Sequence, residues 1–312
     1  MRIVVALGGN ALLHRGESPE AGTQTRRLAD VAPALAALAS QHELVIVHGN
    51  GPQVGLLADE NASDTAIARA YPLGDMVAES QGLIGLWIQQ AVHNAGATKP
   101  TVAVVSQTVV NAADPAWLTP TKFIGPGYEE AEAHTLERSC DWSFAQDGVT
   151  WRRVVGSPEP LEIVELAIVE RLLSSGTTVI VGGGGGVPVQ KEPAGLRTVD
   201  AVIDKDSVAA LLAIRLSADL LVILTDVPAV MVEFGTDHQH PIGATTVDAL
   251  AQHDFADGSM GPKVSAALKF SRATGRRSAI GSLDEAQAVV RGDSGTQIGS
   301  STEMTSNSGA TA

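Results

Sequence analysis

The chain has 312 residues and a net charge of −14, with 35 Asp and Glu against 21 Lys and Arg. At about 150 residues per domain, this length allows one large α/β domain or two smaller ones. Hydrophobic residues make up 44% and charged residues 18%, which excludes a disordered chain. The negative charge disfavours nucleic acids and anionic membranes as partners, so an anionic substrate would need locally placed cations. The single cysteine, Cys140, is typical of a reducing cytosol, and we predict a cytoplasmic enzyme.

Short apolar runs alternate with longer amphipathic stretches along the chain. The runs predict buried strands at 3–7, 44–47, 101–105, 177–181 and 220–225. Helical spacing is found at 25–40, 77–94, 161–174, 206–216 and 263–274, and Pro33 should kink or divide the first helix. This alternation predicts a mostly parallel sheet covered by helices on both faces. No stretch reaches the roughly 18 to 20 apolar residues of a membrane helix.

The alternation stops between Asn111 and Ser157, where turn-forming dipeptides and three of the four tryptophans replace the apolar periodicity. We interpret this stretch as a subdomain inserted into a single domain that spans residues 1–298. The remaining segment, 299–312, is rich in Gly, Ser and Thr, and we expect a disordered tail there.

Glycine clusters follow three of the predicted strands. They are Gly8-Gly9 before Asn10, Gly49-Asn50-Gly51 after His48, and the five glycines Gly182 to Gly186. The carboxyl ends of parallel strands form a ligand crevice, and loops without Cβ atoms let backbone N–H groups approach an anion. A tight turn explains any one cluster equally well, but three at one edge favour an anion site. Neither a dinucleotide fingerprint after the first strand nor a Walker A motif is present in the sequence.

Three of the lysines have unusual surroundings. Lys122 lies between two prolines, Lys205 is flanked by Asp204 and Asp206, and Lys263 follows a proline at a predicted helix start. Lysines organised by an aspartate suit the neutralisation of a transferred phosphoryl group. The alternatives are a solvated helix start for Lys205 and a plain surface lysine for Lys122. Lys263 opposes the helix dipole unless an anion shares its site.

The ordered set of motifs resembles carbamate kinases, within the amino acid kinase superfamily. The two most specific strings are His48-Gly49-Asn50-Gly51-Pro52-Gln53-Val54-Gly55 and Gly258-Ser259-Met260-Gly261-Pro262-Lys263. The others lie at 6–12, 78–85, 120–122, 152–155, 182–189, 202–206, 224–227 and 295–298. The resemblance therefore extends along nearly the whole chain.

The resemblance implies an α/β/α sandwich with an open, mainly parallel sheet of about eight strands, the protruding subdomain at 111–157, and a homodimer. It also implies an ATP-dependent phosphotransferase that catalyses ATP + carbamate ⇌ ADP + carbamoyl phosphate. Mg²⁺ would be held mainly by the nucleotide phosphates, with no metal site on the protein. Arginine metabolism and purine nitrogen recycling both remain open as the pathway, and so does the direction in the cell, although ATP formation is thermodynamically favoured.

Three groups of site residues follow from the resemblance, residue by residue. Carbamate or carbamoyl phosphate would contact Gly8, Gly9, Asn10, Gly49, Asn50, Gly51 and Ser80. The transferred phosphoryl group would lie among Lys122, Lys205 and Lys263, with Asp206 orienting the lysines. The nucleotide would contact Gly183, Gly184, Thr225, Asp226, Met260 and Gly261. We expect the protruding subdomain to act as a lid that brings Lys122 to the phosphoryl group.

The sequence departs from the family pattern in and beside the subdomain, at Phe123, Gly127, Trp151 and Gly156, and Ala229-Val230-Met231 replaces a usual tyrosine of the adenine region. Two alternatives are a non-catalytic homologue that binds carbamoyl phosphate or nucleotide, and a kinase of the same fold for another small acid. Retention of the three lysines and Asp206 disfavours the first, and the lack of a placed arginine disfavours the second. His48 is predicted to order the backbone rather than to transfer a proton.

Overall fold

The computed structural model describes residues 1–14, 16–64, 66, 71–140, 142–255 and 260–299. Its main sheet has eight strands in the order β15-β17-β16-β12-β1-β2-β9-β3. These are β1 Arg2–Leu7, β2 Glu43–His48, β3 Thr101–Ala103, β9 Thr178–Ile180, β12 Leu220–Thr225, β15 Ala244–Thr246, β16 Ser278–Ser282 and β17 Thr296–Gly299. All neighbours pair in parallel except β16 and β17, which confirms the predicted mainly parallel sheet.

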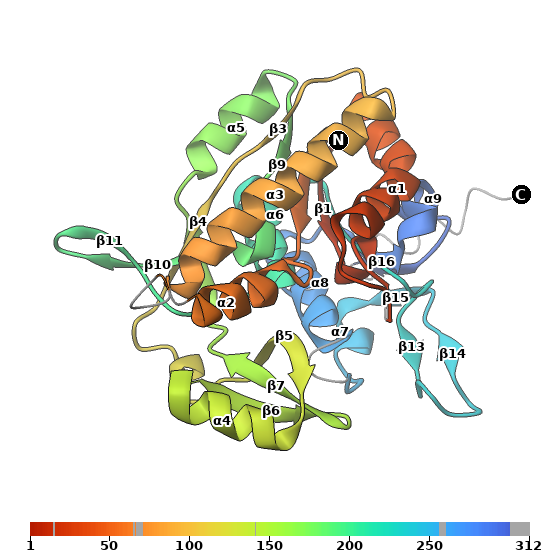
Figure 1. Cartoon of the computed structure of the whole chain (residues 1–312). Coiled ribbons are helices and arrows are strands. Elements are labelled where there is room, and N and C mark those ends of the chain that lie inside the picture. Colours follow the sequence, from red (N-terminus) through yellow and green to blue (C-terminus); the bar gives the residue numbers. More distant parts are fainter. Residues whose placement is uncertain (15, 65, 67–70, 141, 256–259, 300–312) are drawn as a thin grey trace, which may run out of the picture.

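Helices cover both faces of this sheet (Figure 1). One face carries α1 Ala21–Gln41, α3 Leu73–Asn94 and α9 Ala286–Arg291, and the other carries α5 Leu166–Ser174, α6 Lys205–Arg215, α7 Val247–Leu250 and α8 Met260–Thr274. Successive side chains of β1 alternate between the two cores: Ile3 and Val5 pack with α1 and α3, whereas Val4 and Ala6 pack with α6 and α8. The predicted α/β/α sandwich is confirmed. None of the described helices is long and apolar enough to cross a membrane.

Two details of the structure differ from the predicted elements: the start of one helix and the continuity of another. The helix predicted at 161–174 begins only at Leu166, because Pro160–Ile163 forms strand β8 and pairs with β4, Gln107–Val110. Pro160 has no N–H for a helical hydrogen bond, and the pairing with β4 decides the conformation of this short apolar run. Pro33 does not divide α1, because it lies on the exposed side, where water can bond the carbonyl that its ring displaces.

A second sheet has four strands in the order β11-β10-β4-β8, of which β10 and β11 follow the third glycine loop and β4 and β8 precede it. Its remaining strands are β10 Val187–Glu192 and β11 Gly195–Thr198, and a separate hairpin pairs β13 Met231–Val232 with β14 His240–Pro241. Short 3-10 turns are formed by Gly9–Ala11, Pro115–Trp117, Gly183–Gly185 and Leu283–Glu285. The sequence patterns predicted neither this sheet nor the hairpin.

A third sheet, in the order β5-β7-β6, lies apart from the main sheet (Figure 1). It comprises β5 Lys122–Tyr128, β6 Ser143–Asp147 and β7 Thr150–Val155, packed with α4 Glu130–Cys140. We call these four elements the β5–β7 unit. It lies within the stretch where the sequence predicts an insertion, and it contacts α2, Gln53–Ser63.

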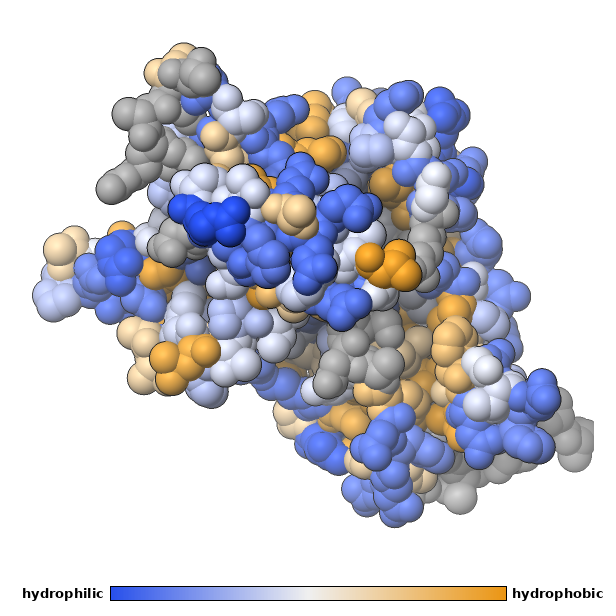
Figure 2. Space-filling view, turned by 60° about the horizontal axis from the view of Figure 1, so that its bottom comes forward, coloured by the Kyte–Doolittle hydropathy of each residue, from blue (hydrophilic) through white to orange (hydrophobic). Residues whose placement is uncertain are grey.

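Figure 2 turns the lower side of the molecule forward, where hydrophilic residues cover most of the face and hydrophobic ones show in smaller areas. The predicted tail at 299–312 begins one residue too early, because Gly299 is the last residue of β17 and belongs to the main sheet. The rest of the predicted tail, 300–312, lies outside the described residues.

Candidate active site

The glycine loops after β2 and β9 pack against each other at the carboxyl edge of the main sheet. A Cβ on Gly184 would lie 1.8 Å from Asn50 Oδ1, and one on Gly183 would lie 2.4 Å from His48 Nε2. Gly184 also has a φ of +62°, a value that L side chains rarely adopt. Any larger residue at these positions would therefore separate the two loops.

The loop after β1 lies beside the end of β12. The N–H of Gly8 donates to the carbonyl oxygen of Leu224 at 2.8 Å, and Gly9–Ala11 then forms a single 3-10 turn. Of Asn10, which lies in this turn, only the backbone is described. Because β1 lies between β12 and β2 in the sheet, its loop lies next to the glycine loop after β2, at the same edge of the sheet.

A buried hydrogen bond fixes the side chain of Asn50. Ser80, on α3, donates its hydroxyl proton to Asn50 Oδ1 at 2.7 Å, and both residues are buried. The next residue of α3, Gln81, accepts hydrogen bonds from the backbone N–H and the hydroxyl of Ser106, both at 3.0 Å. Ser106 in turn accepts from the N–H of Gly182 at 3.0 Å. Helix α3 therefore orders the second and third loops together.

A cluster of buried charges begins at the amino end of α6. Asp206 Oδ1 lies 2.5 Å from Lys205 Nζ, and Asp206 Oδ2 lies 3.5 Å from Lys263 Nζ, which reaches it from the start of α8. The side chains of Asp206, Lys205 and Lys263 are only 3%, 11% and 16% exposed. One buried carboxylate therefore holds two of the lysines that the sequence predicted for the phosphoryl group.

The third lysine reaches the cluster from the β5–β7 unit. Lys122 Nζ donates to Asp204 Oδ2 at 2.6 Å, while Asp204 Oδ1 caps α6 by accepting from the N–H groups of Asp206 and Ser207. Sequence reasoning did not include Asp204 among the site residues. The sequence did contain a signal for Asp204, because it is one of the two carboxylates that flank Lys205 and it lies just before a predicted helix, where aspartate is a preferred cap.

The charges of the cluster shift two pKa values. Burial lowers the pKa of Lys263, and the nearby positive charge of Lys205 lowers it further, whereas Asp206 opposes both effects. Burial raises the pKa of Asp204, but the charges of Lys122 and Lys205 outweigh burial and bring it to about 2. Asp204 is therefore ionised at neutral pH. Three lysines against two aspartates leave one net positive charge when all five groups are ionised, which suits an anionic ligand.

The residues predicted to contact the nucleotide come from separate elements. Thr225 ends β12 and donates to Oδ1 of the exposed Asp226 at 3.0 Å. Met260 and Gly261 are the first residues of α8, and both are half-buried. Residues 258 and 259 of the same motif lie outside the described residues.

The departures from the family pattern have local partners in the structure. The guanidinium of Arg152 lies over the ring of Phe123, 5.5 Å from its centre. A Cβ on Gly127 would lie 2.6 Å from Thr150 Oγ1, and one on Gly156 would lie 3.4 Å from the ring of a neighbouring tryptophan. Trp151 lies beside the ring of His134 on α4, with the ring centres 5.7 Å apart. Phe123, Gly127 and Trp151 thus have close neighbours within the β5–β7 unit, and Gly156 has one just outside it.

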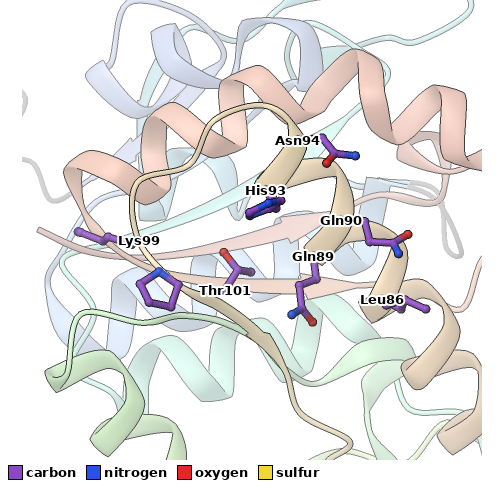
Figure 3. Close-up of a pocket in the computed structure, with 8 residues that line it drawn as sticks. Leu86, Gln89, Gln90, His93, Asn94, Lys99 and Thr101 are labelled. Carbon is purple, nitrogen blue, oxygen red and sulfur yellow. The ribbon is translucent and has the colours of Figure 1, made fainter.

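A surface hollow lies elsewhere, beside the amino end of β3 (Figure 3). It is lined by Leu86, Gln89, Gln90, His93, Asn94, Lys99, Pro100 and Thr101. Since β3 runs parallel to β9 and its neighbours, this hollow is at the edge of the sheet opposite the glycine loops. It therefore does not belong to the cluster of lysines and loops.

His48 is held neutral inside the second loop. It is 2% exposed, and its Nδ1 lies 2.7 Å from the carbonyl oxygen of Gly49. Burial, with a smaller effect of Lys205, lowers its pKa from 6.5 to about 4. Neutral His48 with its proton on Nδ1 can donate to that carbonyl, an arrangement that orders the backbone.

This pKa predicts how stability depends on pH. In the unfolded chain His48 takes up a proton near pH 6.5, whereas in the folded protein it does so only near pH 4. The contribution of neutral His48 to the free energy of unfolding is therefore complete above pH 6.5 and falls as the pH is lowered from 6.5 to 4. Between pH 7 and pH 5, the parent should lose about 2 kcal/mol more free energy of unfolding than His48→Gln. Urea unfolding at both pH values measures this difference. Parallel losses in the two proteins would contradict a neutral, buried His48.

Sequence and structure comparisons agree with the motifs. The sequence model of the amino acid kinase family matches residues 1–282. Carbamate kinase of Haemophilus influenzae is 47% identical over 305 residues, which are 97% of this chain and 98% of that protein. Carbamate kinase of Escherichia coli K12 is 47% identical over 296 residues, covering 95% and 98%. The solved structure of carbamate kinase from Giardia lamblia bound to AMP-PNP is 36% identical, with a TM-score of 0.87, covering 96% and 98%. These matches confirm the resemblance found in the sequence, and the chain belongs to the amino acid kinase family.

Proposed function

We propose that this chain catalyses the reversible phosphoryl transfer ATP + carbamate ⇌ ADP + carbamoyl phosphate. The observation that carries the proposal is the meeting of Lys122, Lys205 and Lys263 around Asp206, which is buried, and Asp204, which is partly buried. The three lysines come from a strand and two helices that are far apart in the sequence. The relatives that are 47% identical over almost the whole chain are carbamate kinases.

In the proposed mechanism, the lysines neutralise the phosphoryl group while it passes between the two oxygens. Such a group carries its charge on its peripheral oxygens, so positioned cations stabilise the transition state. Asp206 would orient Lys205 and Lys263 and compensate the repulsion between their charges. Carbamate is already an anionic nucleophile and needs no general base, which agrees with the neutral, backbone-bound state of His48.

The glycine loops would hold the small substrate and the nucleotide. We assign carbamate and carbamoyl phosphate to the first two loops with Ser80, and the nucleotide to Gly183, Gly184, Thr225, Asp226, Met260 and Gly261. Gly49 connects the loops to the lysines, since a Cβ there would lie 3.5 Å from Lys205 Cδ. The substrate would therefore lie between backbone N–H groups and the charge cluster.

The nucleotide would bring Mg²⁺, held mainly by its phosphates. Asp204 and Asp206 are each engaged by a lysine at 2.6 Å or less. Among the described residues, no group of three or more His, Cys, Asp or Glu side chains is placed to hold a metal ion. Bound through the nucleotide, the metal would neutralise phosphate charge.

We further propose that residues 1–298 form one domain with an inserted subdomain at 111–157, and that two copies form a cytoplasmic homodimer. Strand β3 is at the edge of the main sheet, and Leu83 and Leu86 of the adjacent α3 are 41% and 48% exposed. An unpaired edge strand beside exposed leucines is a common pairing surface. Sedimentation should therefore give twice the chain mass of 32.2 kDa.

The decisive experiment is a coupled assay of ATP formation from ADP, Mg²⁺ and carbamoyl phosphate. Formation of ATP is the expected result, and in the cell this direction would make ATP, for example in arginine metabolism. Binding of carbamoyl phosphate or nucleotide without ATP formation would instead support the non-catalytic homologue. ATP formation only from another acyl phosphate would support a kinase of the same fold for a different acid.

Lys122→Ala should reduce turnover while leaving the KM for ADP nearly unchanged. The lost charge would act on the transferred group, and binding of the nucleotide base and ribose does not depend on it. Steady-state kinetics with varied ADP measure both parameters. Lys191→Ala is the matched control, because Lys191 is 57% exposed and pairs with Glu162 on the surface. Full activity of Lys122→Ala would rule out a role for this lysine.

If the subdomain also acts as a lid, limited proteolysis should cut within 111–157 in the free protein. ADP and carbamoyl phosphate together should protect this segment, because a closed lid orders its backbone. Unchanged cleavage with saturating ligands would refute the lid but would be compatible with a static Lys122.

A further inference from the structure

The β5–β7 unit touches α2 through a contact between two glycines. A Cβ on Gly55, in α2, would lie 2.1 Å from the Cα and 2.4 Å from the N of Gly125 in β5. Real Cβ atoms do not come this close to backbone, so alanine at position 55 would displace one of the two elements. Gly125 has a φ of +70°, which also favours glycine.

The shape of β5 explains how Gly125 reaches the helix. Ile124 pairs with Arg153, and Tyr128 pairs with Trp151. Between these two pairs the chain advances by four residues in β5 but by only two in β7. The extra residues form a bulge that bends the strand out of the regular ladder. Gly125 is the first residue of this bulge, and it is therefore the point where the strand leaves its own sheet to meet α2.

A hydrogen bond supports the glycine contact at the other end of the bulge. Tyr128 donates its hydroxyl proton to Asp59 Oδ1 at 2.7 Å. Asp59 is four residues after Gly55, so both lie on the same face of α2. Burial raises the pKa of Tyr128, and its bond to Asp59 raises it further, so the hydroxyl keeps its proton at neutral pH.

Both contacts bear on the lysine at the start of the same strand. Lys122 is the first residue of β5, three positions before Gly125, and its Nζ lies 2.6 Å from Asp204 Oδ2. A short hydrogen bond of this kind tolerates little displacement of the strand. The placement of β5 on α2 therefore sets how far the Lys122 ammonium extends into the charge cluster.

We propose that Gly55, Asp59, Gly125 and Tyr128 form a docking seat that positions Lys122 for phosphoryl transfer. These four are positioning residues, since they act through Lys122. The proposal rests on the proposed function, which gives Lys122 its task. Helix α2 begins at Gln53, shortly after the second glycine loop, and it contains Gly55 and Asp59. Under this proposal, α2 couples the second glycine loop to the β5–β7 unit.

The first test compares Tyr128→Phe with Tyr71→Phe. The chain has two tyrosines, and Tyr71 is 55% exposed, so its variant removes the same hydroxyl from a side chain that lies mostly in solvent. Tyr128→Phe should lower kcat by about fivefold to tenfold with a KM for ADP within about twofold, and Tyr71→Phe should match the parent. Asp59→Asn retains an oxygen acceptor and should retain most of the activity, whereas Asp59→Leu should behave like Tyr128→Phe. Parental kcat in both Tyr128→Phe and Asp59→Leu would overturn the seat.

The second test shows whether the seat acts through Lys122. In a Lys122→Ala background, Tyr128→Phe should cause no further loss of kcat, because the positioned group is already missing. A loss as large as in the parent background would overturn the positioning role and indicate general stability instead.

A third measurement does not depend on the reaction. Gly55→Ala and Tyr128→Phe should both speed proteolytic cleavage within 111–157 by several-fold, because an undocked unit opens more often. If the parent makes no ATP, the proposed function fails, yet faster cleavage in these variants would still support the seat. Cleavage rates equal to the parent would overturn it, whatever the reaction is. Tyr128→Phe keeps this test valid if Gly55→Ala does not fold.

Discussion

Lys263→Ala should lower kcat by at least about 10²-fold with a smaller change in KM. Lys263 is 16% exposed at the start of α8, and its ammonium lies 3.5 Å from Asp206 Oδ2. Its positive charge is needed most when the phosphoryl group is between donor and acceptor oxygens, so the loss falls on the transition state more than on substrate binding. Steady-state kinetics of ATP formation measure the split between kcat and KM.

Two further variants test whether the charge of Lys263, and not simply a lysine on α8, is required. Lys263→Arg keeps a positive charge in the cluster and should retain more activity than Lys263→Ala. Lys269→Ala removes a lysine of the same helix that is 42% exposed and pairs with Glu159, so it should leave kcat unchanged. Equal kcat in Lys263→Ala and the parent would exclude Lys263 from the chemistry.

The central part of the fold could be predicted because its signals are local. The strands at 3–7, 44–47 and 220–225 are continuous apolar runs, as expected for parallel strands buried on both faces. Glycines directly after such runs also predict where loops gather, since the carboxyl ends of parallel strands share one edge. These strands and loops can be predicted without knowing which residues far apart in the sequence are in contact.

Other features depend on tertiary contacts that no local pattern contains. The strand at Pro160–Ile163 is four residues long and is decided by its pairing with β4, so a helical interpretation of its sequence was equally good. Asp204 was missed because its partner, Lys122, is 82 residues away in the sequence. The contact of Gly55 with Gly125 is hidden for the same reason, since glycine spacing alone cannot tell a turn from a close approach of backbones.

Asp206→Asn should have an effect at least as severe as Lys263→Ala. The carboxylate is 3% exposed and contacts the ammonium groups of both Lys205 and Lys263. Asparagine keeps the size of the side chain but removes its charge, so only Asp204 would be left to compensate the repulsion between the two lysines. We expect kcat to fall by about 10²-fold or more, because neither lysine would keep its position.

The proton on Lys263 makes this prediction specific. Burial and the charge of Lys205 already lower the pKa of Lys263, and Asp206 is the main group that raises it again. Removing that carboxylate lowers the pKa further, so more of Lys263 is neutral at a given pH. The alkaline fall of kcat should therefore move to lower pH in Asp206→Asn, and activity should partly recover as the pH is lowered. A profile that keeps its shape would contradict this account.

A folding control decides between catalysis and structure. Asp206 lies in the first turn of α6, where an acidic residue also stabilises the helix end. If its role is to orient the lysines, Asp206→Asn should unfold in a cooperative thermal transition and still bind ADP, while kcat is low. A collapsed transition would mean that the carboxylate chiefly holds α6 and α8 together. Comparing kcat, thermal unfolding and ADP binding in one variant therefore shows whether Asp206 acts on the lysines or on the fold.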